Sequence, residues 1–579
     1  MKLASAFGFT NANEFPDDSY VVALFSDKFS WLGKIGDGES TILLTGPRGC
    51  GKTMILRSFR LRSLMAKQRE DETAEQTRRR IATASCVGFF VSARLAVGLY
   101  RSLGETPAWL DSPVHSNSFF VLAFLQEIID SFLYGAETDL GLLSETETDG
   151  LCGIIEEILG PAVSHELKVT VAHFSRLERI SRSIEMLIER IVGAPITPAD
   201  IPPAVHSPKA LLSVWEFLSK KVQLLKGQRV IFLLDDFTQP LIPEKCQQSF
   251  LPLMFATLGY HFIVSAHSRS VALEDLSGVR YDPSREFTEI NLGAEFVKEQ
   301  DHRTKCEEFL DDIFRRRFEK ANDLKGKNLR DLLGSSSYIG GSVAEEIAHR
   351  HRKKRLRGLK FHGVDTLVQL CTGDVSAIIE LVGGLFRKQR ATGAAEIPIA
   401  ATKQNAAIRL YARRELRKIL DIREVDGHSL YEMATKFGQM SREKILLYAR
   451  DKKVSKGTRA PQFLRIEIET TLSLPQADEA KLKALLQHGI FVDGLLGAAH
   501  NGSPTQVLIF RKLFCPAFPT CLASQDSFSW TSATFARFLR NPRAVRFGEM
   551  QANEPPLDLF DETVVVSDAS RELDDLEGA

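Results

Sequence analysis

The feature that most constrains this chain is the loop Gly46-Pro47-Arg48-Gly49-Cys50-Gly51-Lys52-Thr53, which has the pattern G-x-x-x-x-G-K-[ST]. A β-branched, apolar run precedes it, and an apolar segment with helical periodicity follows it. Glycines let such a loop turn its backbone N–H groups inward, and the following helix presents its positive N-terminal end. The loop in this strand-to-helix context predicts a phosphate-binding site in an α/β fold.

The residue types of the loop predict which part of a bound nucleotide each residue contacts. We expect the backbone from Gly46 to Gly51 to surround the phosphates of ATP. The Lys52 ammonium is expected to neutralise the β and γ phosphates, and the Thr53 hydroxyl to coordinate Mg²⁺.

A second acidic feature follows an apolar run, VIFLL at residues 230–234, which ends in Asp235 and Asp236. An acid at the end of a buried parallel strand lies at the carboxyl edge of the sheet, beside the phosphates. We therefore predict that Asp235 holds Mg²⁺ and that Asp236 orients the attacking water. Asp236 is one methylene shorter than the more usual Glu, which favours slow hydrolysis or a switch; an ordinary strand-end turn is the alternative.

Composition points to a soluble globular protein of several domains. Lys and Arg together number 74, as do Asp and Glu, so any binding to nucleic acid must come from local patches. The eight cysteines are scattered without a C-x-x-C pair, which favours reduced thiols in the cytoplasm. The start of the chain lacks a signal peptide pattern, and the most apolar segment, residues 118–133, contains Gln126, Glu127 and Asp130. It is predicted to be a buried helix rather than a membrane span.

Short β-rich runs alternate with helical stretches in the first half of the chain, which predicts a parallel sheet covered by helices. The expected strands are residues 41–45, 87–92, 230–234, 261–265 and 287–292. We expect an α/β nucleotide-binding domain at residues 1–294, with a helical insertion at about 100–226, then a helical lid at 295–395, a winged-helix-like domain at 400–550 and an acidic disordered tail at 551–579.

In that third region the pattern predicts helices at residues 403–423, 429–437, 441–452 and 477–488, and strands at 463–471 and 507–514. Helices followed by strands in this order suit a winged helix.

Four stretches carry a resemblance to a known family: FPDDSYVVALF, ILLTGPRGCGKTMILRSF, VIFLLDDF and LVQLCTGDVSAIIELVGGLF. The chain resembles AAA+ ATPases of the origin-recognition and replication-initiator (ORC/Cdc6-like) clade, specifically their bacterial relatives. The resemblance covers most of residues 15–386 and implies a lid and a winged-helix domain after the nucleotide domain. Where the family's lid carries a sensor arginine after its Gly-Asp pair, this chain has Ser376, so coupling between hydrolysis and lid closure is in question.

The same resemblance suggests further site residues. Ser265 or His267, at the end of the run 261–267, stands where such ATPases carry a sensor. Arg280 and Arg285 precede the last expected strand, the region that projects an arginine finger onto the γ-phosphate of a neighbour in a homo-oligomer; we select Arg285 as the catalytic finger. An ordinary strand end, and solvated surface arginines, are the respective alternatives.

Local basic clusters are the candidates for binding duplex DNA. One is the run from His349 to Lys360, which also suits a solvated loop. A second is the stripe Arg409, Arg413 and Arg417 at i, i+4 and i+8 of a helix, and a third comprises Lys452, Lys453, Lys456 and Arg459.

Three functions remain open at this point. The first is an ATP-dependent, DNA-associated switch in bacterial DNA transactions or anti-phage defence. The second is a STAND-like signalling ATPase that self-assembles to control an effector protein, suggested by the Asp-Asp ending and the large insertion. The third is a protein-remodelling ATPase, which the lack of an aromatic-hydrophobic-Gly pore loop after the second strand disfavours.

Overall fold

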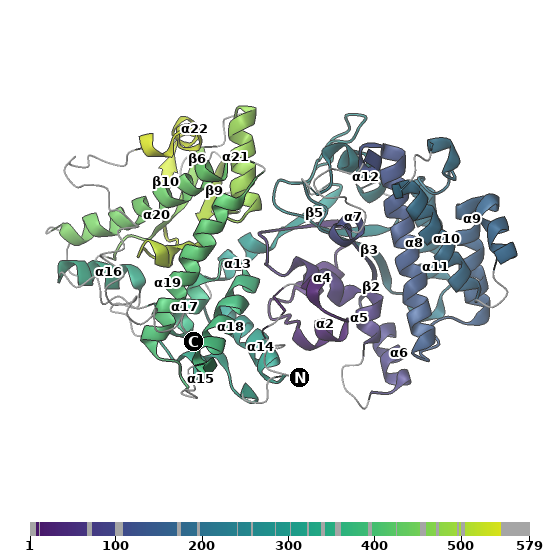
Figure 1. Cartoon of the computed structure of the whole chain (residues 1–579), viewed down its shortest axis with the longest axis horizontal. Coiled ribbons are helices and arrows are strands. Elements are labelled where there is room, and N and C mark those ends of the chain that lie inside the picture. Colours follow the sequence, from purple (N-terminus) through teal and green to yellow (C-terminus); the bar gives the residue numbers. More distant parts are fainter. Residues whose placement is uncertain are drawn as a thin grey trace. The chain divides into compact units, whose positions relative to one another are not determined.

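The computed structural model describes residues 7–545 apart from 8, 11, 67–71, 99–107, 171–174, 194–196, 240, 256–258, 284, 301–302, 321–323, 337–341, 354–360, 392–396, 424, 452–458, 470–473, 495–496 and 499–503. The chain divides into two compact units. Unit 1 comprises residues 1–328, 372–380 and 486–493, and unit 2 comprises residues 329–371, 381–485 and 494–579. Figure 1 labels their elements along the chain.

A five-stranded sheet forms the centre of unit 1. Its strands are β1 (Thr41–Thr45), β2 (Cys86–Ser92), β3 (Arg229–Asp235), β4 (His261–Ser265) and β5 (Phe287–Asn291), in the order β2-β3-β4-β1-β5. Every neighbouring pair is parallel, as expected for an α/β fold. Strands β1 and β2 are buried along their whole length, because a parallel sheet is covered on both faces. The five predicted strands are confirmed.

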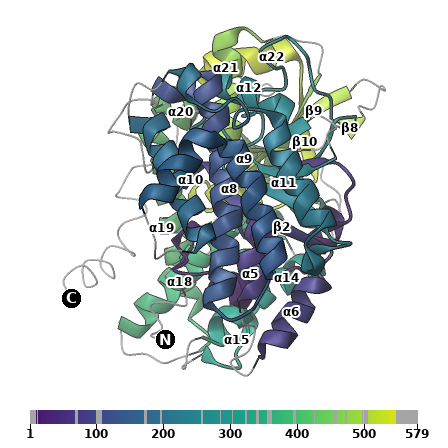
Figure 2. The same cartoon turned by 90° about the vertical axis from the view of Figure 1, so that its right-hand side faces the viewer.

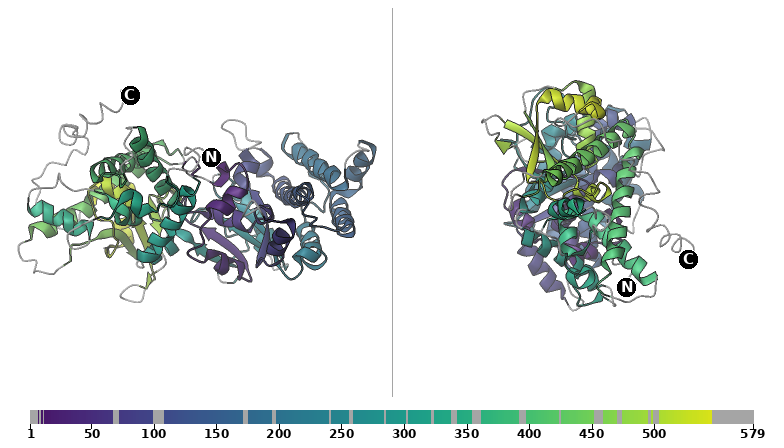
Figure 3. Two further views of the ribbon diagram at one scale, coloured as in Figure 1. Left: turned by 90° about the horizontal axis from the view of Figure 1, so that it is seen from below. Right: turned by 90° about the vertical axis from the view of Figure 1, so that its left-hand side faces the viewer.

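Four long helices form the insertion between β2 and β3: α8 (Pro113–Glu137), α9 (Glu145–Thr170), α10 (Arg176–Gly193) and α11 (Pro208–Lys220). They lie side by side as the blue helices of Figure 1, Figure 2 and the left-hand view of Figure 3. By length and composition α8 could span a membrane, but 67% of its most apolar window is buried inside the molecule, as in the core helix of a globular protein. This agrees with the buried helix expected at residues 118–133.

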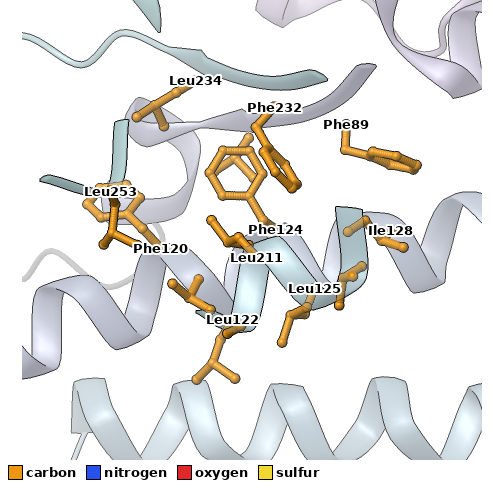
Figure 4. Close-up of a cluster of buried hydrophobic side chains, with 14 of the residues drawn as sticks. Phe89, Phe120, Leu122, Phe124, Leu125, Ile128, Leu211, Phe232, Leu234 and Leu253 are labelled. Carbon is orange, nitrogen blue, oxygen red and sulfur yellow. The ribbon is translucent and has the colours of Figure 1, made fainter. Parts of the chain in front are cut away.

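Aromatic side chains join α8 to one face of the sheet. The ring of Phe124 lies 5.3 Å from that of Phe232 on β3 and 5.6 Å from that of Phe262 on β4, both edge to face. Figure 4 shows Phe232 and Leu234 of β3 directed toward Phe120 and Phe124 of α8. Because these side chains are fully buried, the insertion shares one hydrophobic core with the nucleotide-binding sheet.

The remaining helices of unit 1 surround the same sheet. They are α2 (Ser19–Leu24), α3 (Trp31–Gly36), α4 (Lys52–Phe59), α5 (Leu61–Met65), α6 (Ala74–Ala82), α7 (Ala93–Gly98), α12 (Glu244–Phe255), α13 (Leu292–Gln300) and α14 (Arg303–Phe318), with short 3₁₀ turns η1 (Ala12–Glu14), η2 (Ala108–Asp111), η3 (Pro198–Asp200) and η4 (Gln223–Leu225). Helix α4 contacts β2, β3 and β4, so the loop before it lies at the carboxyl edge of the sheet.

A buried ion network fastens the segment before α2 to α4 and α8. Arg57 of α4 donates to Asp18 at 2.6 Å, and Arg60 contacts Asp18 at 3.1 Å. Arg60 also forms two 2.7 Å hydrogen bonds with Glu127 of α8. Although burial opposes the charged form, Glu127 and Asp18 raise the pKa of Arg60. The network positions residues 12–18, which also border the nucleotide loop.

Unit 2 combines helices with a second sheet. Its helices are α15 (Leu329–Leu333), α16 (Val343–Arg352), α17 (Gly363–Leu370), α19 (Ala401–Arg417), α20 (Gly427–Arg450), α21 (Gln476–Gln487) and α22 (Ser532–Arg540), with η8 (Lys418–Asp421), η9 (Lys512–Ala517) and η10 (Pro542–Ala544). Helix α18 (Val375–Ala391) begins in unit 1. The sheet contains β10 (Asp526–Trp530), β6 (Phe463–Glu469) and β9 (Pro504–Phe510) in that order, and β8 (Gly497–Ala498) pairs with β9; β7 (Phe491–Asp493) belongs to unit 1.

Two expectations for this region were wrong in detail. The separate helices predicted at 429–437 and 441–452 form one helix, α20, because Gly438 does not end it. Gly438 instead lies against the ring of Phe518, where a β-carbon would come within 2.3 Å of the ring. The strand predicted at 507–514 ends at Phe510, since the chain turns there into η9 around Pro516.

Candidate nucleotide-binding site

The loop between β1 and α4 has the backbone that a phosphate cradle requires. Gly46, Gly49 and Gly51 have φ angles of +143°, +83° and +98°, a region that side chains strongly disfavour. A cavity of about 300 Å³ adjoins the loop within unit 1. Its walls include Thr10, Ala12, Asn13, Glu14, Phe15, Trp31, Arg48, Gly49, Cys50, Gly51, Lys52, Thr53, Met54, Arg94, Asp236, His267, Arg317 and Ser376.

Lys52 is buried at the start of α4, and its ammonium is turned into the loop. Its Nζ donates to the backbone oxygens of Gly46 at 2.8 Å and Pro47 at 3.1 Å. The positive charge therefore lies on the inner side of the loop, where backbone N–H groups and the helix end also favour an anion. This arrangement fits the phosphates of a nucleotide.

Thr53 and Asp235 place oxygen atoms together beside the cradle. The Thr53 hydroxyl donates to Asp235 Oδ2 at 2.8 Å, and the Ser265 hydroxyl donates to Asp235 Oδ1. Burial raises the pKa of Asp235, and the nearby charge of Asp236 adds to this, whereas the two hydroxyl bonds and the Lys52 charge oppose it. A hydroxyl and a carboxylate are oxygen ligands of the kind that Mg²⁺ prefers, so this pair fits the metal.

Asp236 lies at a left-handed backbone position, with φ of +58°. Its backbone N–H donates to Ser265 Oγ at 3.0 Å, and its carboxylate accepts a 2.7 Å hydrogen bond from Arg94 Nε of α7. Asp236 and Arg94 both line the cavity. The sequence interpretation missed Arg94, although its place two residues after β2, at the carboxyl edge of the sheet, is a signal that could have identified it.

The two sensor candidates occupy different places. Ser265 is fully buried and contacts both acids, as described above. His267 reaches the cavity wall instead, and burial lowers its pKa well below the usual value, with the charges of Lys52, Arg48 and Arg94 acting in the same direction. A hydrogen bond with the backbone of Gly46 partly opposes this shift. His267 is therefore neutral at pH 7.

Ser376, at the position of the missing arginine, contacts the nucleotide loop. Its backbone N–H donates to Gly49 O at 3.1 Å, and a β-carbon on Gly49 would come within 2.0 Å of the Ser376 hydroxyl. The cavity nevertheless contains a further arginine, Arg317 of α14, which sequence reasoning also missed. Burial lowers the pKa of Arg317 to about 10, and its Nη1 donates to Phe9 O at 3.1 Å. Because Arg317 lies far along the chain from the nucleotide loop, no local sequence pattern could have identified it.

The remaining predicted residues lie elsewhere. Arg280 and Arg285 are exposed and do not line this cavity. On α19, Arg417 is exposed whereas Arg409 and Arg413 are partly buried. Lys452, Lys453 and Lys456, residues 354–360 and the acidic tail lie outside the described residues.

A comparison with models of protein families identifies the family of the chain. The model of the ORC-CDC6-like family matches residues 5–358 and 342–494, which together cover most of the chain. The chain belongs to the ORC-CDC6-like family. This membership makes it an AAA+ ATPase, and it confirms the resemblance to the ORC/Cdc6-like clade. Nothing among curated proteins or solved structures matched it. Members of the ORC-CDC6-like family commonly form oligomers and bind DNA, as well as nucleotide and usually Mg²⁺.

Proposed function

We propose that the protein is an ATP-binding and ATP-hydrolysing switch that acts on DNA. The observation that carries the nucleotide part is the 2.8 Å contact between Thr53 and Asp235, next to the buried Lys52 of a glycine-rich loop. Bound ATP would place its phosphates on this loop, and Mg²⁺ would be held by Thr53 and Asp235 and would polarise the phosphoryl oxygens.

The chain's own residues divide the work as follows. The loop backbone and Lys52 bind and orient the phosphates. Asp236 holds the attacking water, while His267 contacts the loop. Ser265 fixes the Asp235 carboxylate and accepts a hydrogen bond from the backbone N–H of Asp236. Arg285, exposed and away from its own cavity, acts on the nucleotide of a neighbouring subunit in a homo-oligomer.

The DNA part of the proposal rests on family membership and on the cations of unit 2. We assign residues 295–395 as a lid and 400–550 as a winged-helix-like domain that contacts duplex DNA, in bacterial DNA transactions or anti-phage defence in the cytoplasm. The order β6, α21, β7 and β9 along the chain supports a winged-helix-like arrangement.

A STAND-like signalling ATPase is the second candidate. The contact of Arg94 with Asp236 favours it, because a carboxylate engaged by a cation is less available to orient water. Such a protein would self-assemble on binding ATP and control an effector protein, without affinity for DNA.

The nucleotide assignment is tested by equilibrium binding of a labelled ATP analogue with Mg²⁺. Lys52→Ala is expected to weaken binding at least about a hundredfold, since the buried counter-charge is lost. The matched control is Lys34→Ala, which removes an exposed lysine of the same unit and should leave affinity unchanged. Equal affinity of the Lys52→Ala variant and the wild type would refute the assignment.

A further inference from the structure

One stripe of α19 carries three arginines. Arg409, Arg413 and Arg417 recur every four residues, so they lie along one side of the helix. The Arg409 guanidinium lies 5.7 Å from the centre of the Phe361 ring, and its Nε is buried without a hydrogen-bond partner among the described residues. Arg409 and Arg413 are both partly buried, which a general electrostatic surface for DNA would not require.

Helix α20, which contacts α19, carries a fourth arginine and two residues with hydroxyl groups. Tyr431, Thr435 and Arg442 lie on one side of α20, because 11 residues make about three helical turns. The charges of Arg413 and Arg442 act on Arg409, and the charge of Arg417 acts on Tyr431. Helices α19 and α20 also contact each other directly, so these pairs of residues come from neighbouring helices. We call Arg409, Arg413, Arg417 and Arg442 the arginine seam.

Burial lowers the pKa of three arginines of the seam, and neighbouring arginines add to this shift for two of them. Burial, with the charges of Arg413 and Arg442 acting in the same direction, lowers the pKa of Arg409 to about 10. Burial and Arg417 likewise lower the pKa of Arg413. Burial also lowers the pKa of Arg442, whereas the charge of its neighbour Glu443 raises it. The positive charges of the seam therefore repel one another.

The nearby acids do not remove this charge. Glu415, the acid of α19 at this end, is buried and contacts Lys418 at 2.5 Å and Arg511 at 3.4 Å. Glu443 is itself half-buried, and burial raises its pKa. Within the described ranges, Arg409, Arg413 and Arg442 form no ion pair with an acid. Buried cations without a counterion oppose folding, and an anion that bonds to all of them would relieve this cost.

We propose that the arginine seam binds a phosphate group through Arg409, Arg413 and Arg442. Guanidinium groups present forks of N–H donors, and a phosphate offers enough oxygens for three of them, whereas a carboxylate has only two. The hydroxyls of Tyr431 and Thr435 are further donors. The phosphate could belong to a nucleic-acid backbone or to a free phosphorylated molecule; the first case rests on the proposed DNA association.

The test uses the full chain with its nucleotide loop saturated with Mg-ADP. One probe is a short fluorescein-labelled DNA duplex, and the other is inorganic phosphate, followed by its effect on the unfolding temperature. R413Q and R442Q each remove one seam charge. R414Q is the matched control, because Arg414 is the next residue of α19 but is exposed and lies over the Tyr411 ring at 4.7 Å.

We expect R413Q and R442Q to weaken binding of at least one probe about fivefold or more, and R414Q to stay within about twofold of the wild type. If the duplex is the ligand, each seam variant should also reduce the salt slope by about one unit. Without phosphate, R442Q should unfold at the wild-type temperature or above it, since a repelling charge is gone. Phosphate should stabilise the wild type more than either seam variant if the free anion is the ligand.

Equal losses for R413Q and R414Q with both probes would overturn the proposal, as would binding by both seam variants that matches the wild type. Unfolding of R413Q and R442Q below the wild-type temperature, with unchanged binding, would show a structural role instead. Duplex binding that survives in the seam variants leaves the DNA association standing and rejects the seam. If neither the wild type nor any variant binds the duplex, the DNA association is rejected. The phosphate site is nevertheless supported in that case if phosphate raises the unfolding temperature of the wild type more than that of R413Q.

Discussion

Arg94 Nε and Asp236 Oδ2 are joined by a 2.7 Å hydrogen bond at the carboxyl edge of two neighbouring strands. The Arg94 side chain is 41% exposed, whereas that of Asp236 is 15% exposed. The acid proposed to position water is therefore held by a cation that has space to move away.

Replacing Arg94 should change turnover more than binding. We expect Arg94→Ala to raise basal ATP hydrolysis about three- to tenfold, because loss of a partly exposed ion pair worth roughly 1 kcal/mol frees the carboxylate. ATP affinity should change less than about twofold. Steady-state hydrolysis and equilibrium binding measure the two effects, with Arg94→Lys as the control that keeps the charge. A fall in turnover would show that Arg94 supports catalysis.

Substitutions of the adjacent acids Asp235 and Asp236 should have different effects. Asp235→Asn is expected to weaken Mg²⁺-dependent ATP binding, because it removes the carboxylate that Thr53 and Ser265 contact. Asp236→Asn should retain ATP and reduce hydrolysis at least about a hundredfold, in the range typical of a lost water-orienting group. Binding at varied Mg²⁺ and single-turnover hydrolysis distinguish them; equal loss of binding in both variants would contradict the division.

Asp18 should matter for stability more than a surface acid does. Asp18→Asn leaves the buried Arg57 with a neutral partner and removes one contact from Arg60, so we expect a loss of about 3 kcal/mol in the free energy of unfolding. Glu216→Gln breaks an exposed pair with Lys220 and should cost under about 0.5 kcal/mol. Urea unfolding compares them. Similar losses would mean that the network contributes no more than a surface pair.

Acid should destabilise the protein partly through His267. Its pKa in the folded state lies well below the usual value of 6.5, so its stabilising contribution is complete above pH 6.5 and is lost as the pH falls below that value. Below pH 6.5 the loss approaches about 1.4 kcal/mol per pH unit for this group. His267→Gln should therefore show a shallower decline in unfolding free energy between pH 6.5 and 5. Parallel declines would exclude this contribution.

Arg285 should act between subunits. Arg285→Ala is expected to leave ATP binding intact and to lower hydrolysis only in the assembled protein. Mixing it with Asp236→Asn should restore part of the activity, because a mixed interface can pair an intact arginine with an intact acid. Arg280→Ala serves as the control, since Arg280 is also exposed and close in sequence. Activity that does not depend on protein concentration would argue against an intersubunit role.

The sequence could predict the parts of the site whose residues lie within one short stretch of chain. The loop from Gly46 to Thr53 carries its own strand and helix signals, and the run before Asp235 marks the second ligand because a buried parallel strand ends there. Their meeting at 2.8 Å follows from parallel strands ending at one edge of the sheet.

The parts that failed depend on packing between distant segments. Arg317 reaches the cavity from a helix far along the chain. Gly438 looked like a helix end, yet the ring of Phe518 requires a residue without a side chain at that point. Periodicity along one helix also could not show that Arg409 lies against the Phe361 ring and is partly buried.

The strand order has a consequence for how the molecule is made. Strand β1, which leads into the phosphate loop, pairs with β4 and β5, and β5 ends only at Asn291. Contacts between segments so distant in sequence form slowly, because a long stretch of chain must first be closed into a loop. During synthesis the helices α8 to α11 emerge before either partner of β1. A nascent chain that stops short of β4 and β5 thus contains the whole nucleotide motif without the neighbours that hold it in shape, and affinity for nucleotide arises late in translation.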